Sequence, residues 1–444
     1  MPSLLAIKIV AFICLLALFF IMPVLAKNPT RPWFDGAKRY RVKITACATP
    51  FADELLEIPV NFSQLLKAKH EPVDIETIRI VETSHDGLQE LSSATPFQFD
   101  KASNFSLKRV AGTLLFITKK SDQADADRMR YYEVYFDTSP EARTPPPTPA
   151  PLLTMDTQAT DEGMDCLRIT NKSAVFFFQK QAGGLSSLFD KDGADWINFN
   201  ASIKGPAGTY RGLPNMVNAS RLQKIKDGKP SLKALKLPPE HAPPAGYEVV
   251  PIIPRNDYFH PGFSNCKTEI VHEGPLKITL KAASDDGGWI CLWEFLPDYA
   301  RMTVLKAKRS YWFLYEGTPG GGPDCKAGHC VRMDGEKLPL DVAWKSVSSG
   351  LQWAYFESPN SENAFYLAHN ATRPTVMSYW LLDDAMTVFG FGRDGMQQQL
   401  RGAGQEFLIG FLDNKQQSFD KTSSYLRAIS GKPAGRLQEQ VECR

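Results

Sequence analysis

Residues 254–322 decide the fold class and read PRNDYFHPGFSNCKTEIVHEGPLKITLKAASDDGGWICLWEFLPDYARMTVLKAKRSYWFLYEGTPGGG. Three runs within this stretch, residues 276–283, 287–297 and 300–317, are rich in β-branched and aromatic residues and are closed by Gly and Pro. Such runs are typical of short β-strands. Tyr, Trp, His, Arg and carboxylates recur at the ends of the runs. The stretch therefore predicts a sheet that carries a polar ligand site, and this composition favours a sugar as the ligand.

Length, composition and charge set the outer limits. The chain has 444 residues, which is long for one domain, so we expect two. Its hydrophobic content of 43% is enough for a sizeable core and excludes global disorder. The formal net charge of +2 provides no long-range field, which argues against nucleic acid and against an acidic membrane surface as partners.

The N-terminus carries the pattern of an export signal. Lys8 precedes the apolar run IVAFICLLALFFIMPVLA, which ends in the small residue Ala26 before the chain turns polar. This pattern predicts a signal peptide over residues 1–26. An uncleaved anchor is the alternative, because a run of this length could just span a bilayer. We expect a secreted or periplasmic protein with no membrane attachment once the signal is removed.

Residues 38–138 predict a small antiparallel β-sandwich. Alternating or β-branched runs, separated by turn residues, fill this part of the chain. The segment NFSQLLKAKH is a candidate short helix. The Pro-rich stretch SPEARTPPPTPAP at residues 139–151 then favours an extended linker, with a long loop inside one domain as the alternative.

Residues 152–430 predict a second, larger β-domain. Strand-like runs recur through it, and SFDKTSSYLRAIS near its end predicts a helix followed by Gly431. We expect no regular elements in the basic, Pro-rich residues 220–245, which favour a solvated surface loop, with a flexible rim that helps to hold an acidic polymer as the alternative. The segment DKDGAD at 190–195 is interpreted as an Asp-Gly hairpin turn rather than a calcium loop, because Ala201 stands where a bidentate Glu would be needed.

Seven cysteines follow the apolar N-terminal run, and two of them are close in sequence. Cys325 and Cys330 lie in PDCKAGHCV, which favours a local disulfide if the protein is exported. Free thiols, or a metal knuckle completed by His329, are the alternatives.

Several segments resemble those of known proteins. QKQAGGLSSLFDKDGADWINF is similar to the strand, Gly turn and Asp-Gly hairpin of galactose-mutarotase-like supersandwich proteins. RGLPNMV, FHPGF, EGPLKITL, CLWEFLPDYARMTVLK, YWFLYEGTPGG and MTVFGFGR resemble a group of exported bacterial proteins for which polysaccharides are the expected substrates. The superfamily includes polysaccharide lyases, domains of glycoside hydrolases and sugar epimerases. The resemblance implies a supersandwich fold and a carbohydrate ligand, and it transfers no catalytic residue.

Two glutamates are candidate acids or bases. Glu294 is the lone charge on its face of the strand 287–297, where burial would raise its pKa if that face is concave. Pairing with a nearby Lys or Arg is the alternative. Glu316 ends the strand YWFLYEG, beside a loop that would form a cleft mouth. Together they could hydrolyse a glycosidic bond, as two carboxylates do in most glycosidases.

Aromatic and cationic side chains complete the candidate set. Trp293 and Tyr315 offer faces for sugar stacking, with core packing as the alternative. His260 and Tyr258 could supply the base that a lyase needs, and Arg211 and Arg332 could neutralise a uronate carboxylate. Structural salt bridges are the alternative for both arginines. The remaining candidates are Tyr210 for substrate binding and, with weaker support, His369 and Arg393.

Taken together, the sequence predicts an all-β protein with an N-terminal β-sandwich and a C-terminal supersandwich of antiparallel sheets. We expect an exported carbohydrate-active protein, an enzyme of the lyase or glycoside hydrolase class, acting on a polysaccharide or oligosaccharide. A non-catalytic glycan-binding or cell-surface structural protein is the alternative. No cofactor and no metal site is indicated.

Overall fold

The structure is a computed structural model that describes residues 31–66, 72–92, 95–120, 128–143, 151–216, 220–231, 234, 239, 242–251, 259–322, 324–413, 418–431 and 435–444. The predicted signal peptide 1–26, residues 144–150 of the Pro-rich stretch, and Tyr258 lie outside these residues. Export and the extended linker therefore stay predictions. None of the helices in the described ranges combines the length and apolar character that a membrane span requires.

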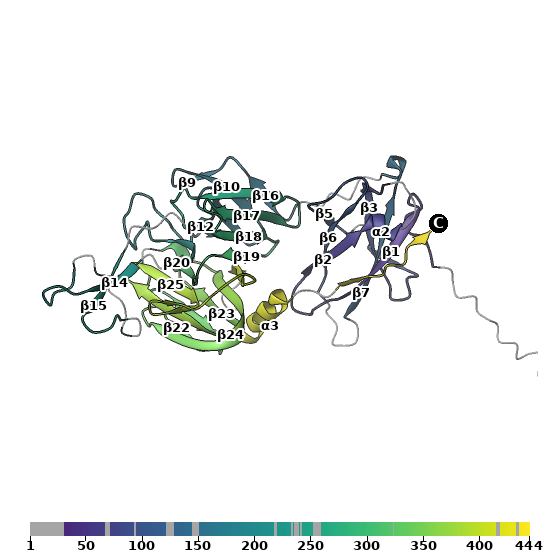
Figure 1. Ribbon diagram of the computed structural model, residues 1–444. Helices are drawn as coiled ribbons and strands as arrows, with labels where there is room; N and C mark the ends of the chain where they lie inside the picture. Colours follow the sequence, from purple (N-terminus) through teal and green to yellow (C-terminus); the bar gives the residue numbers. More distant parts are fainter. Residues whose placement is uncertain are drawn as a thin grey trace, which may run out of the picture.

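Two sheets form the smaller unit, at the right of Figure 1. The first sheet contains β1 (Tyr40–Cys47), β3 (Asp74–Thr83), β4 (Glu90–Ser92), β7 (Met129–Asp137), β29 (Gly435–Leu437) and β30 (Glu442–Cys443). The second contains β2 (Glu54–Asn61), β5 (Phe97–Lys101) and β6 (Ala111–Thr118). The helix α2 (Phe62–Leu65) follows β2, within the segment expected to form a short helix.

Alternating side chains build the core of this unit. In β2, Leu56, Ile58 and Val60 are buried in the core between the sheets, whereas Glu57 and Pro59 point the opposite way. The outward face of the second sheet is therefore available to contact the rest of the chain.

The C-terminal residues return to the smaller unit. β29 pairs with β1 through Ile44 and Leu437, and β30 pairs with β1 through Tyr40 and Cys443. Figure 1 shows this last segment, in yellow, running back from α3 (Phe419–Ser430) to the purple strands. The sequence did not indicate this return.

The larger unit is one hydrogen-bonded antiparallel system that curls on itself. Its strands are β8 (Thr154–Asp156), β9 (Thr160–Asp161), β10 (Met164–Thr170), β11 (Ala174–Gln179), β12 (Gly184–Asp190), β13 (Gly212–Asn215), β16 (Cys266–His272), β17 (Ile278–Ser284), β18 (Trp289–Phe295), β19 (Tyr299–Ala307), β20 (Phe313–Gly317), β21 (His329–Arg332), β22 (Lys337–Pro339), β23 (Trp344–Glu357), β24 (Ala364–Leu382), β25 (Met386–Phe391) and β28 (Glu406–Leu412). The expected all-β architecture with sandwich-like sheets is confirmed.

Two small hairpins and two short 3₁₀ turns complete the described elements. β14 (Ser220–Lys224) pairs with β15 (Tyr247–Pro251), and β26 (Arg393–Asp394) pairs with β27 (Gln397–Gln398). The 3₁₀ turns cover Pro140–Ala142 and Pro319–Gly321. The expectation that residues 220–245 lack regular structure is wrong at its start, because β14 gains a cross-strand partner that lies outside that window.

The sequence predicted most of the central strands but not all of their limits. The first two runs form β17 and β18, as expected. The third run divides into β19 and β20, because the chain leaves the ladder between Lys308 and Trp312. The late helix is confirmed as α3, which Ser418 caps by accepting a hydrogen bond from the backbone N–H of Lys421.

The cysteines and the Asp-Gly segment have structural roles. The expected disulfide between Cys325 and Cys330 is absent: both thiols are free, and Cys325 donates to the carbonyl of Ala385 at 3.0 Å. Asp190 accepts hydrogen bonds from the backbone N–H groups of Asp192 and Ala194, as the hairpin interpretation requires. Within the described ranges, no three His, Cys, Asp or Glu side chains are grouped as a metal site would need.

The side chain of Gln98 links the two units, because it hydrogen-bonds to backbone groups as a neighbouring strand would. Gln98 in β5 accepts hydrogen bonds from the backbone N–H groups of Leu276 and Lys277 through Oε1, at 3.0 and 2.9 Å. Its Nε2 donates to the carbonyl of Lys277 at 2.9 Å. Gln98 thus satisfies three backbone groups beside β17 that would otherwise be buried without partners.

Candidate active site

Glu316 lies in the middle of the larger unit's sheet, on the side away from the main core. Side chains alternate from residue 311 into β20: Tyr311, Phe313 and Tyr315 belong to the main core, whereas Trp312 and Leu314 pack in a separate cluster with Trp380 of β24. Glu316 lies on the same face of the strand as Trp312 and Leu314. It pairs across the strands with Gly212 of β13 and with Val388 of β25, which in turn pairs with Trp380.

The carboxyl group of Glu316 is almost buried and is held by one amide. Asn215 donates a hydrogen bond from Nδ2 to Oε2 of Glu316 over 2.9 Å. Burial raises the pKa of Glu316 to about 7, although the Asn215 hydrogen bond and the positive charge of Arg393 both lower it. A carboxyl group with this pKa can give or take a proton at neutral pH.

Arg393 supplies the positive charge beside this carboxyl. Its guanidinium lies 3.9 Å from the ring centroid of Trp380 and 4.6 Å from that of Trp312, and its Nε donates to the carbonyl of Gly395. Burial lowers the pKa of Arg393, and the charge of Glu316 opposes that effect. The indole faces thus fix a weakly hydrated cation next to the acid.

The site retains contact with solvent. Glu316, Arg393 and Asn215 keep exposed fractions of 6%, 7% and 9%, whereas Leu314 in the same strand has none. Tyr210 is only half-buried, and its pKa is raised by burial and by the carboxylates of Asp383 and Glu316. At the edge of the cluster, the neutral phenol of Tyr210 is therefore the most exposed group that interacts with the titratable carboxyl of Glu316.

Arg211 and His260 hold the segment that carries Tyr210. Arg211 donates to the carbonyls of Pro206, Asn198 and Ala385 at 2.8–3.2 Å. The two ring nitrogens of His260 face the carbonyls of Pro261 at 2.8 Å and Tyr210 at 3.2 Å. Burial lowers the pKa of His260, although both carbonyls raise it. With its ring nitrogens on backbone oxygens, His260 positions this segment rather than serving as a free base.

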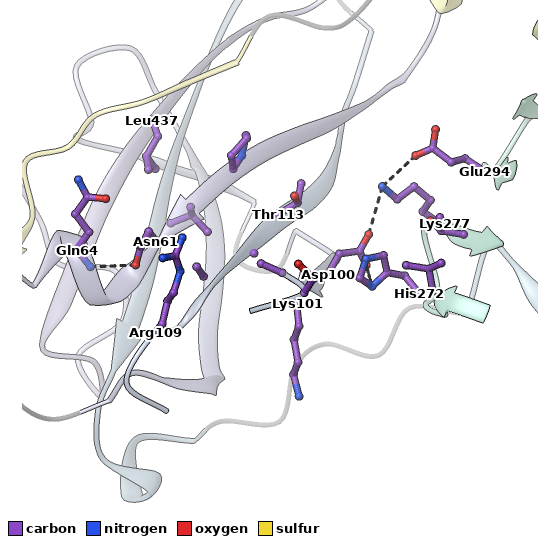
Figure 2. Close-up of a pocket in the computed structure, with 18 of the residues that line it drawn as sticks. Asn61, Gln64, Asp100, Lys101, Arg109, Thr113, His272, Lys277, Glu294 and Leu437 are labelled. Carbon is purple, nitrogen blue, oxygen red and sulfur yellow. Dashed lines mark hydrogen bonds and ion pairs between the residues drawn. The ribbon is translucent and has the colours of Figure 1, made fainter. Parts of the chain in front are cut away.

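Glu294 belongs to a different place, the cleft between the two units. Figure 2 shows it at one end of a chain of charges with Lys277 and Asp100. Lys277 Nζ lies 3.5 Å from Glu294 and 3.3 Å from Asp100, and Arg301 Nε lies 2.8 Å from Glu294. The cleft has a volume of about 1000 Å³ and is bordered by the outer face of β2, β5 and β6.

The electrostatics of Glu294 differ from those expected for an acid catalyst. Burial acts to raise its pKa, but the charges of Arg301 and Lys277 outweigh burial and hold the pKa below its ordinary value. The expected rise does not occur, because the face of β18 that carries Glu294 lies against cations and not in an apolar hollow. The alternative interpretation, a paired carboxylate, describes this residue.

The expected pair of carboxylates does not form a single site. Glu294 interacts with Lys277 and Arg301, whereas Glu316 interacts with Asn215 and Arg393. The two networks share no residue, so cooperation of these glutamates on one glycosidic bond is not supported.

Other candidates are placed in the core or in surface ion pairs. Trp293 and Tyr315 have no exposed surface; Trp293 stacks with Phe295, and the Tyr315 hydroxyl donates to the carbonyl of Trp196. Core packing therefore replaces the expected sugar contacts. Arg332 pairs with Asp334 and Glu336, which matches the salt-bridge alternative.

His369 is also structural. Its Nδ1 lies 2.9 Å from the carbonyl of Glu406, its ring stacks on Phe407, and burial lowers its pKa to about 4.

Sequence reasoning missed Asn215, Trp380 and Asp383. Asn215 was visible in RGLPNM, but nothing in the sequence shows that β13 adjoins β20. Trp380 and Asp383 lie in YWLLDDAMTVFGFG, one of the strand-like runs of the predicted second domain. Asp383 and Asp384 both have positive φ, of 51° and 54°, in the turn between β24 and β25. Consecutive aspartates before an alternating run were a usable hairpin signal.

Comparisons with known proteins give matches only among solved structures. No protein-family model matches the chain, and no curated protein matches it. Among solved structures, an α-mannosidase from Enterococcus faecalis V583 aligns with a TM-score of 0.48 at 8% identity, over 91% of this chain and 46% of that chain. The chain thus spans about half the length of that α-mannosidase.

Two further neighbours align with the chain over about half its length. A galactose mutarotase-like protein from Lactobacillus casei ATCC 334 has a TM-score of 0.31 at 12% identity, covering 55% of this chain and 98% of that chain. A GH36 α-galactosidase from Geobacillus stearothermophilus has a TM-score of 0.26 at 10% identity, covering 55% of this chain and 40% of that chain. A galactose mutarotase-like protein, the class that the sequence resembles, is thus among the structural neighbours. At these identities and scores, the similarities assign no activity.

Proposed function

We propose that this protein is an exported carbohydrate-active enzyme in which Glu316 transfers a proton during cleavage of a polysaccharide or oligosaccharide. The observation that carries the proposal is a nearly buried carboxyl with a pKa of about 7 that lies between an amide donor, Asn215, and a cation, Arg393. Perturbed carboxyl groups of this kind are characteristic of catalytic sites, because acid–base catalysis is most effective when the pKa lies near the working pH.

The surroundings of Glu316 suit a sugar. Asn215 and Arg393 are donors that can hold hydroxyl or carboxylate groups, and Tyr210 offers a half-buried aromatic face with a polar tip. The apolar N-terminal run that follows Lys8 supports export.

Two reactions remain as forms of this proposal. In hydrolysis, Glu316 would protonate the leaving glycosidic oxygen while water attacks the anomeric carbon with help from a second carboxylate. Asp383 is a candidate for that second group, because its charge, like that of Glu316, raises the pKa of Tyr210. In elimination, a base removes the proton next to a uronate carboxyl, the C–O bond at C4 breaks, and Glu316 protonates the departing oxygen.

A panel of acidic and neutral polysaccharides, incubated with the purified mature protein, tests the proposal. New ultraviolet absorbance from an unsaturated uronate indicates elimination, and new reducing ends without absorbance indicate hydrolysis. Glu316→Gln is the control for contaminating activity, because it removes the titrating group with little change in shape. Retention on immobilised glycan with neither signal would contradict the enzyme and favour the non-catalytic glycan-binding alternative.

A further inference from the structure

The β14–β15 hairpin carries a cluster of exposed cations. Lys224, Lys226 and Lys229 are all exposed, and no ion pair within 4 Å engages them among the residues that the structure describes. Asp227 is the one acidic side chain in the same turn. Glu248 on β15 is buried instead, where it accepts hydrogen bonds from Gln223 Nε2 at 3.0 Å and from the backbone N–H of Ser231 at 2.5 Å.

Two of these lysines face each other across the turn, and their charge repulsion destabilises the hairpin. Lys226 and Lys229 are directly opposite across a tight turn, with the Lys229 N–H donating to the Lys226 carbonyl at 3.2 Å. Asp227 and Gly228 between them have φ of 54° and 68°, as a two-residue hairpin turn requires. Like charges directly opposite each other destabilise a ladder. An anion bound between the two ammonium groups would remove this repulsion.

An aromatic face adjoins the same cluster. Tyr247 pairs with Lys224 across the hairpin and is 43% exposed. A lysine beside an exposed ring suits a ligand that carries both a sugar face and an acidic group, because the ring stacks on the former while the ammonium binds the latter.

The position of the hairpin connects it to Glu316. β14 begins shortly after Asn215, which donates to Glu316, and the chain reaches His260 shortly after β15 ends. Figure 1 shows the hairpin extending from the larger unit on the side away from the smaller unit. The hairpin is therefore close in sequence to the two segments that carry Asn215 and His260.

We infer that the β14–β15 hairpin is a binding surface for an anionic polysaccharide, one that carries uronate or similar acidic groups. This inference rests on the proposed function, since it names the class of glycan that the Glu316 site would receive. The lysines bind carboxylates along the polymer and Tyr247 stacks on a sugar ring, so the hairpin contributes to affinity and not to bond cleavage.

The test compares two triple charge reversals in the full-length Glu316→Gln protein, so that binding is measured without turnover. K224E/K226E/K229E changes the hairpin, and K108E/K267E/K421E makes the same change in net charge at exposed lysines elsewhere. Affinity for polygalacturonate, for a neutral glucan and for duplex DNA is measured at low and at moderate salt.

We expect the hairpin variant to lose about tenfold in affinity for polygalacturonate, as the loss of three exposed ion pairs would give, together with most of the salt dependence. The matched variant should keep both. Tyr247→Ala should weaken polygalacturonate binding without changing its salt dependence. This single substitution tests the hairpin independently if the triple variant does not fold.

The inference would be overturned if both triple variants lost the same affinity for polygalacturonate, or if the hairpin variant lost none. It would also be overturned if the hairpin bound duplex DNA more tightly than polygalacturonate. The proposed function fails separately. A wild-type protein that binds polygalacturonate through the hairpin but cleaves no glycan would retain this inference and refute the enzyme.

Discussion

Asn215 donates a hydrogen bond to Oε2 of Glu316 over 2.9 Å, and it reaches this carboxyl from β13, a strand adjacent to β20. The bond favours the ionised form of Glu316 while burial favours the neutral form, so the pKa is a balance between them. Each group around Glu316 can therefore be tested by the direction in which it moves this pKa.

Asn215→Ala should raise the pKa of Glu316, because the variant loses a hydrogen bond that stabilises the carboxylate. A hydrogen bond to a charged group contributes about 1.5 kcal/mol or more, so a shift of roughly one pH unit is expected. The measurement is the pH profile of kcat/KM. The limb of this profile that reflects ionisation of Glu316 should move to higher pH. A limb that stays in place would show that Asn215 does not set this pKa.

Arg393→Met should also raise the pKa of Glu316, since it removes the cation that lowers it. Arg393→Lys retains a charge but loses the planar stacking between Trp312 and Trp380. In the pH profile of kcat/KM, the limb that reflects Glu316 should therefore lie between those of the wild type and the Met variant. Identical pH profiles for the Lys and Met variants would contradict the electrostatic role of Arg393.

The raised pKa of Glu316 also predicts how stability depends on pH. Its pKa rises from an ordinary value of 4.5 to about 7, so between these values the folded chain holds a proton that the unfolded chain has lost. The free energy of unfolding therefore falls as the pH rises through this window. Glu316→Gln should be more stable than the wild type at pH 8, by up to about 3 kcal/mol, with the difference vanishing near pH 4.5.

Glu54 provides the matched control for that prediction. Burial raises its pKa to about 7 as well, and it lies in β2 of the smaller unit. Glu54→Gln should show the same pH-dependent gain in chemical denaturation and should leave glycan turnover unchanged. A stability difference for Glu316→Gln that is the same at pH 5 and pH 8 would argue against a raised pKa.

Glu294→Gln should destabilise the fold and leave the chemistry intact. The variant leaves the buried Lys277 and Arg301 with less compensating charge, which is expected to cost about 3 kcal/mol of unfolding free energy. Turnover per folded molecule should be unchanged. A selective loss of kcat in a fully folded Glu294→Gln protein would restore this glutamate as a catalytic candidate.

Gln98→Ala should loosen the contact between the two units. It leaves the backbone N–H groups of Leu276 and Lys277 and the Lys277 carbonyl without their partner. Each unsatisfied buried group costs about 1 kcal/mol or more. Hydrogen exchange should accelerate at residues 276–277, and unchanged protection there would contradict the role of Gln98.

Local pattern predicted much of the fold and part of the site. Alternation in β18 and β20 placed Trp293 and Glu294, and Tyr315 and Glu316, on opposite faces, as the structure has them. Those assignments depend on a period of two residues, which is a local property. What the pattern could not provide was the neighbour of each face. Glu294 meets Lys277 and Arg301, and Glu316 meets Asn215 and Arg393, through pairings between strands that are distant in sequence.

The same limit explains the other errors. Trp293 and Tyr315 are aromatic residues of the kind that bind sugars, but their faces of the sheet are covered by the main core. Cys325 and Cys330 are close in sequence, yet Cys325 turns toward Ala385 and does not meet Cys330. The C-terminal return to β1 had no local signal, since its two short strands become regular only through pairing with Tyr40–Cys47.

The most direct test of the central claim measures glycan turnover and glycan binding side by side for the wild type and Glu316→Gln, on a polysaccharide that the wild type cleaves. We expect Glu316→Gln to lose at least about a hundredfold in kcat, as removal of a general acid or base gives, with binding affinity nearly unchanged. Turnover that survives in a folded Glu316→Gln protein would contradict a catalytic role for Glu316, because proton transfer would then belong to another residue.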